Sequence, residues 1–195
     1  MSVRFQKALG RALILAGALT FAFWAELMVK QFWIQRAARH MLESTQEYRT
    51  SRQNGGNGSR QAGPKMGDVI GQLEIPRIQI SVMVLEGSRP TILDVAAGHI
   101  EGTALPGTVG NVAIAAHRDT FFRSLREIRT NDIIHLTTAQ GDFRYSVGGI
   151  EVVEPSDIRV LRQTTEPELT LVTCYPFHYI GAAPKRFVVH ARRSS

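Results

Sequence analysis

The residues best suited to covalent chemistry are one cysteine and one histidine, each at the end of a predicted strand. Cys174 is the only cysteine in 195 residues, which excludes an intrachain disulfide and a zinc site of paired cysteines. It ends the run LTLVTC (169–174), and Tyr-Pro-Phe follows at once, so the thiol lies beside a loop. His117 closes the apolar run NVAIAA (111–116). A thiolate attacks a carbonyl and an imidazolium then protonates the leaving amine, so this pair predicts acyl transfer.

Both residues also have a structural explanation. A lone cysteine in an apolar strand is more often a small buried hydrophobe than a nucleophile. A histidine at a strand end is likewise more often structural than catalytic. Among the other histidines only His99, in GHIEGTALPG, is a further candidate for the base, because the rest lie within predicted strands, in the loop after Cys174 or in the N-terminal arm.

Arg186 is the candidate for electrostatic assistance. It opens the run RFVVHAR (186–192), and the eleven residues between Cys174 and Arg186 are too few for a helical crossover, which predicts an antiparallel hairpin. A guanidinium beside the thiol would favour the thiolate and stabilise a tetrahedral oxyanion. The sequence does not fix the register, and a surface arginine at a strand edge is the alternative.

The elements that must position these residues are short strands. From residue 69 onward the chain alternates β-branched and polar residues between Gly and Pro, which predicts an all-β domain, with two short helices around 91–97 and 119–127. The absence of long helical crossovers favours a barrel or sandwich. Alternation places Thr170, Val172 and Cys174 on one face. The predicted strand runs are 69–80, 81–87, 110–117, 132–138, 143–155, 169–175 and 186–192.

The N-terminal third has a different composition. A short basic tail (1–11) precedes an apolar segment (12–29) whose only charge is Glu26, and this length predicts a transmembrane anchor. A cleaved signal peptide is the competing interpretation, but no small-x-small cleavage site follows. Residues 30–65 predict a juxtamembrane helix and a Gly/Ser/Asn-rich linker, and 66–195 the catalytic domain. We expect a single-pass plasma-membrane protein with its N-terminus inside.

The net charge of +6 belongs to this N-terminal arm. Residues 1–65 hold 10 Lys and Arg against 3 Asp and Glu, whereas residues 66–195 hold 13 against 14. The basic pI therefore describes a membrane-proximal arm, and we expect no nucleic-acid partner.

Three ordered blocks resemble the sortase family of cysteine transpeptidases. TLVTC (170–174) matches the Thr-Leu-x-Thr-Cys motif, APKRFVV (183–189) is similar to the family's last strand with its arginine, and GHIEGTALPGTVGNVAIAAHRDTFFRSL (98–125) resembles its histidine region. The resemblance covers about 66–195, and the segments after Cys174 look most like class D sortases.

This resemblance implies a closed eight-stranded β-barrel with Cys174 as nucleophile, His117 as acid/base and Arg186 as electrostatic helper. It further implies cleavage of a Leu-Pro-x-Thr-Gly-like sorting signal between Thr and Gly, a thioester intermediate, and transfer to an amine of a cell-wall peptide or a pilin lysine. We expect no obligatory cofactor. Some sortases bind calcium in the loop before the cysteine strand, where this chain has Glu154, Asp157, Glu166 and Glu168, although a solvated loop explains these residues equally well.

Two alternatives from other classes remain open. The cell-wall L,D-transpeptidases are also Cys/His enzymes with histidine first, but they carry a Ser-x-Gly-Cys motif that this chain lacks. Papain-like hydrolases are excluded because their cysteine precedes the histidine. A non-catalytic tethered β-domain that binds an extracytoplasmic partner is the second alternative, and it predicts a Cys174 thiol that resists alkylation in the folded state.

Overall fold

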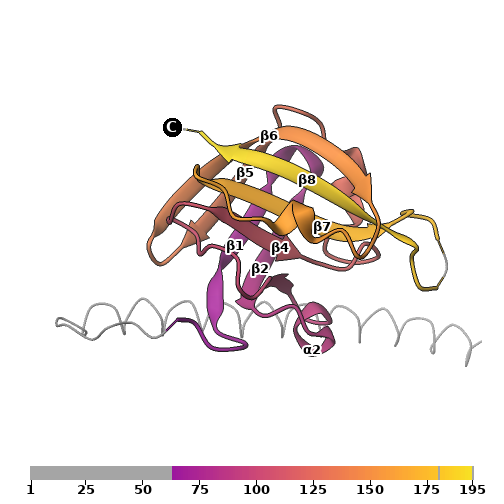
Figure 1. The fold of residues 1–195 in the computed structure, drawn as a ribbon, viewed down its shortest axis with the longest axis horizontal. Coiled ribbons are helices and arrows are strands. Elements are labelled where there is room, and N and C mark those ends of the chain that lie inside the picture. Colours follow the sequence, from indigo (N-terminus) through magenta and orange to yellow (C-terminus); the bar gives the residue numbers. More distant parts are fainter. Residues whose placement is uncertain (1–62, 180, 195) are drawn as a thin grey trace, which may run out of the picture. The chain divides into compact units, whose positions relative to one another are not determined.

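The computed structural model describes residues 63–179 and 181–194. In this part of the chain the strands close into a barrel in the order β1-β2-β3-β4-β7-β8-β6-β5 (Figure 1). The predicted closed eight-stranded barrel is thus confirmed. The predicted anchor at 12–29 and its flanking segments lie outside the described residues. Among the residues that are described, none of the helices has both the length and the apolar character that crossing a bilayer requires.

Most elements are short, as the closely spaced Gly and Pro residues predict, and the longest is β6 with 13 residues. The strands are β1 (Val69–Ile75), β2 (Ile80–Glu86), β3 (Ala97–His99), β4 (Asn111–Ala115), β5 (Ile133–Thr138), β6 (Gly141–Val153), β7 (Glu168–Tyr175) and β8 (Lys185–Arg193). The helical turns are α2 (Pro90–Leu93) and the 3₁₀ segments η1 (Pro76–Ile78), η2 (Arg123–Glu127) and η3 (Ile158–Leu161).

The strand predicted at 69–80 ends earlier in the structure, because β1 stops at Ile75 and the next predicted run, 81–87, corresponds to β2. Pro76 has no backbone N–H for a ladder, and η1 begins there. Gln79 then adopts a left-handed φ of 54°, which turns the chain back into β2. The helix predicted at 119–127 is shorter, since only η2 forms within it.

The side-chain alternation that the sequence predicts separates the barrel core from its outer face. Leu169 and Leu171 of β7 are fully buried in the core, and each contributes about 1.5–3 kcal/mol by leaving water. Of the three residues that the alternation placed on one face, Val172 and Cys174 are partly buried, whereas Thr170 is buried. The nucleophile candidate is therefore held by a strand whose opposite face is anchored in the core.

The sheet pairings around β7 position the site. β7 pairs parallel with β4 on one side and antiparallel with β8 on the other, and Figure 1 shows the β7–β8 loop projecting at one end of the barrel. At the last matched pair, Ala115 and Val172, the Ala116 amide donates to the Val172 carbonyl (3.2 Å), and just beyond it the Thr173 hydroxyl donates to the Ala116 carbonyl (2.7 Å). The end of β4 is thus fixed against the end of β7.

Candidate active site

Cys174 and Arg186 are directly opposite each other on neighbouring strands. The β7–β8 pairing is antiparallel, as predicted, and its register matches Cys174 with Arg186. Side chains at opposed positions share a face, with Cβ atoms about 4.5–5.5 Å apart. The guanidinium Nη1 donates to the carbonyls of Ala183 (3.3 Å) and Lys185 (3.0 Å), which hold the side chain at the end of the hairpin.

His117 reaches the same place from β4. Ala115 is matched with Val172 in the parallel ladder, so the residue two positions later falls level with Cys174. Its Nε2 lies 3.5 Å from Oδ1 of Asp94, the residue directly after α2. Both side chains are well exposed, at 44% and 70%, so this contact contributes at most about 1 kcal/mol. The imidazole remains open to solvent and substrate.

The structure therefore brings the three predicted site residues together at one end of the outer face. Cys174 is a free, partly exposed thiol, so a substrate carbonyl can reach it. A thiol, an imidazole and a guanidinium on three adjacent chain segments can generate a nucleophile, move a proton and stabilise an oxyanion.

His99, the other candidate for the base, has a different environment. Its side chain is buried, and Nδ1 lies 2.7 Å from Oε2 of the buried Glu86. Its Nε2 lies 2.9 Å from the carbonyl oxygen of Ala104. Both ring nitrogens are occupied, so His99 ties β2 and β3 to the following loop and is not available for proton transfer.

Arg118 is a residue of the site that sequence reasoning missed. It is 5% exposed, and its guanidinium donates to the carbonyls of Pro176 (2.9 Å), Tyr179 and Gly181 (3.2 Å) in the β7–β8 loop. It thereby joins the segment after His117 to the segment after Cys174. The only signal in the sequence was its position directly after His117, a candidate site residue at a strand end.

Aromatic rings secure the same loop on the barrel. The rings of Phe177 and Phe187 meet edge to face with centroids 5.1 Å apart, and Tyr175 stacks on Phe187 at 6.2 Å. Phe177 and Phe187 also pack against the main core. The β7–β8 loop therefore has an apolar attachment at its start and a polar one, through Arg118, along its length.

The acidic residues considered for calcium do not converge. Glu154 pairs with Lys185 (3.7 Å), Asp157 with Arg159 (3.3 Å) and Glu168 with Arg192 (3.6 Å). Within 63–179 and 181–194, no group of three or more His, Cys, Asp or Glu side chains could hold a metal ion.

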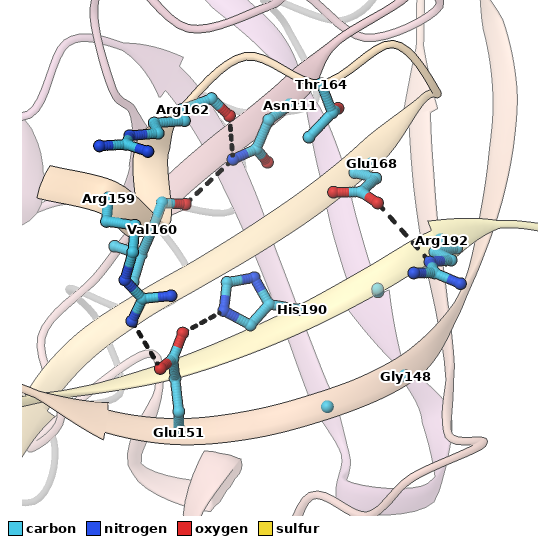
Figure 2. Close-up of a pocket in the computed structure, with 12 residues that line it drawn as sticks. Asn111, Gly148, Glu151, Arg159, Val160, Arg162, Thr164, Glu168, His190 and Arg192 are labelled. Atoms are coloured by element: carbon cyan, nitrogen blue, oxygen red, sulfur yellow. Dashed lines mark hydrogen bonds and ion pairs between the residues drawn. The ribbon is translucent and has the colours of Figure 1, made fainter.

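A polar cavity of about 470 Å³ lies farther along the outer face, beneath the β6–β7 connection (Figure 2). Glu151 accepts a hydrogen bond from Arg159 (2.9 Å), and its Oε1 lies 2.9 Å from Nε2 of His190. Hydrogen bonds from His190 and Arg159 lower the pKa of the Glu151 carboxyl. The Asn111 amide donates to the Val160 carbonyl (3.0 Å). These groups partner one another, so the network holds η3 and its loop on the barrel.

Comparison with known proteins agrees with this geometry. The sortase domain model matches residues 73–194. The chain belongs to the sortase family. Sortases are cysteine transpeptidases, and the three residues brought together above belong to the part of the chain that this family model covers.

Individual sortases show the extent of the similarity. The chain is 34% identical over 131 residues to sortase D of Bacillus subtilis, covering 67% of this chain and 66% of that protein. It is 28% identical over 132 residues to sortase A of Streptococcus agalactiae, of which 52% is covered. The matches thus span about half to two thirds of these relatives' length. The Clostridium perfringens sortase D5 transpeptidase superposes with a TM-score of 0.62 at 34% identity, covering 68% of this chain and 83% of that one.

Proposed function

We propose that this sortase cleaves a Leu-Pro-x-Thr-Gly-like sorting signal between Thr and Gly and transfers the acyl part to an amine. The observation that carries the proposal is the register that sets Cys174 opposite Arg186, with His117 two residues after the last β4 residue paired with β7. Each reacting group comes from a separate segment fixed by backbone pairing. Backbone pairing of this kind holds reacting groups in a fixed relative position, which favours attack on a bound substrate.

The proposed reaction has two half-reactions. The Cys174 thiolate attacks the threonine carbonyl, the imidazolium of His117 protonates the departing glycine amine, and the C–N bond breaks to leave a thioester. An acceptor amine then attacks the thioester and loses a proton to the imidazole as the C–S bond breaks. Arg186 has five N–H donors, of which those on Nη1 serve the hairpin carbonyls, so others can serve the oxyanion or substrate carbonyls.

We further propose that the enzyme works at the outer side of the plasma membrane. The support is the sequence: a basic tail, an apolar segment at 12–29 and a polar linker precede the catalytic domain. The acceptor would be an amine of a cell-wall peptide or a pilin lysine, since both occur on that side.

Mass spectrometry of the protein with a Leu-Pro-x-Thr-Gly peptide, with and without triglycine, tests the proposal. We expect a covalent adduct with the mass of the acyl fragment, and a transpeptidation product when triglycine is present. Cys174→Ala should abolish both, and its melting temperature should stay near that of the wild type because one partly exposed sulfur leaves little cavity. Turnover by Cys174→Ala would refute the assignment, and a variant that mainly loses stability would show a structural cysteine.

A further inference from the structure

A small basic cavity lies beside the segments that follow His117 and Cys174. Its volume is about 180 Å³, and it is lined by Arg118, Asp119, Arg123, Arg126, Phe177 and His178. The first four residues follow His117 in the chain, and the last two come shortly after Cys174. The cavity therefore adjoins the reacting groups without containing them.

A backbone turn brings the arginines of this cavity back toward His117. The Phe122 amide donates to the His117 carbonyl (3.0 Å), and the next residue, Arg123, begins η2. On the other side, the hydrogen bonds from Arg118 to the Pro176 and Gly181 carbonyls hold the loop that carries Phe177 and His178. Both walls are thus fixed to the segments that carry the proposed catalytic residues.

The charge of the cavity lining is positive, although residues 66–195 hold 13 basic against 14 acidic side chains. Three arginines face one aspartate, and that aspartate pairs with Arg118 (3.3 Å). Arg126 contacts Glu127 (3.5 Å). Arg123 makes no ion pair with any residue in 63–179 or 181–194. A local excess of this kind attracts an anionic group, and Arg123 is free to bind one.

We propose that this cavity binds a carboxylate of the amine acceptor. The acceptors that this enzyme prefers are then amino acids or peptides with a free carboxylate, rather than isolated amines. This inference rests on the proposed transpeptidation and specifies its second substrate.

The chemistry of the second half-reaction favours this side of the site. The imidazole that protonates the leaving amine must also accept the proton of the incoming amine, by microscopic reversibility. The acceptor nitrogen therefore approaches the thioester next to His117. The N–C bond forms, the C–S bond breaks to release the Cys174 thiolate, and the proton of the incoming amine passes to the imidazole, which restores the imidazolium. An acceptor whose amine is held there can reach the basic cavity with its carboxylate, because Arg118 and Asp119 of the cavity lining directly follow His117.

Matched acceptors test the proposal. Diglycine, triglycine and tetraglycine would each be compared with the corresponding C-terminal amide, which keeps the amine and removes the carboxylate. We measure kcat/KM for the acceptor in wild type, Arg123→Gln, Arg126→Gln and Arg123→Glu. Arg144→Gln is the control, because Arg144 is an exposed arginine that does not line the cavity. Thioester formation without acceptor is measured in parallel.

We expect the wild type to prefer at least one acid over its amide. Each Gln variant at the cavity should reduce this preference about two- to fivefold, the range of a single solvent-exposed ion pair. Arg123→Glu should reduce it further, and salt should weaken it. The control variant should match wild type.

The outcomes separate the two proposals. Absence of the thioester adduct in wild type would overturn the proposed function. A normal adduct with equal use of acids and amides would overturn the cavity assignment alone. So would an acid preference that Arg123→Gln and Arg126→Gln leave unchanged.

Discussion

Removing the Arg118 guanidinium should release the β7–β8 loop and slow the reaction while leaving the barrel folded. The side chain makes hydrogen bonds to three loop carbonyls, and a buried bond to a charged group contributes about 1.5–3 kcal/mol. The loop is partly exposed, so water recovers part of this energy in the variant. We therefore expect a local cost of about 2–4 kcal/mol for Arg118→Met, which shifts the loop about 30- to 900-fold toward open states.

Amide exchange and kinetics measure this shift. The Tyr179 amide, which donates to the Pro176 carbonyl (3.3 Å), should lose protection in Arg118→Met by a factor in that range. A displacement of about 1 Å near reacting groups can cost about a hundredfold, so kcat should fall at least tenfold with a smaller change in KM. Arg118→Lys keeps the charge but cannot reach all three carbonyls. Its kcat and its Tyr179 exchange should therefore lie between those of wild type and Arg118→Met.

The control is Arg144→Met, which removes an exposed arginine elsewhere on the barrel and should change neither quantity. The reasoning is refuted if Arg118→Met keeps kcat and Tyr179 exchange within threefold of wild type. A large drop in melting temperature without a selective change in loop exchange would also contradict it, because it would make Arg118 a global stability residue.

Three further predictions follow from the site and its support. His117→Gln should lower kcat by about 10²–10⁴ and remove one limb of a bell-shaped pH–rate profile. His99→Gln should instead lower the melting temperature and leave the folded enzyme active, and equal rate losses in the two variants would mean that the base is misassigned. Arg186→Ala should slow single-turnover acylation at least about a hundredfold and Arg186→Lys nearly as much, with unchanged circular dichroism melts; acylation within a few fold of wild type would reduce the site to a Cys/His pair. Asp132 accepts hydrogen bonds from Arg77 (2.5 and 2.6 Å), which lower the pKa of its carboxyl. The contribution of this carboxylate to the stability of the fold is therefore complete above the unfolded pKa, about 4, and is lost as pH falls through the folded pKa. The loss of melting temperature at acid pH should be smaller in Asp132→Asn than in wild type.

The sequence was sufficient to predict the parts of the fold that rest on local patterns. Alternation assigned the two faces of β7, and the length of the 175–185 segment predicted the β7–β8 hairpin. These features depend on side-chain period and chain reach, which a single sequence displays. The register that opposes Cys174 to Arg186 depends on pairing energies between strands, so only the structure supplies it.

Other features escaped sequence reasoning for physical reasons. β3 consists of Ala97–His99, whose small residues give no β-branched signal, and it forms because β2 and β4 flank it. His99 and Glu86 lie thirteen residues apart, and their pairing requires the tertiary fold. The role of Arg118 could not be predicted because its carbonyl partners, in the β7–β8 loop, are about 60 positions away in the chain.

The parallel β4–β7 ladder also determines when during folding the segment that carries His117 comes to lie beside the segment that carries Cys174. Its paired residues, such as Val112 and Leu169, are 57 positions apart, and β5 and β6 must be accommodated between them. Closing so long a loop is entropically costly and slow compared with forming hairpins. Until that closure, His117 and Cys174 are not held on neighbouring segments. If His117 activates Cys174 as proposed, the reactivity of this thiol toward a mild alkylating agent should therefore rise late in refolding, with barrel closure.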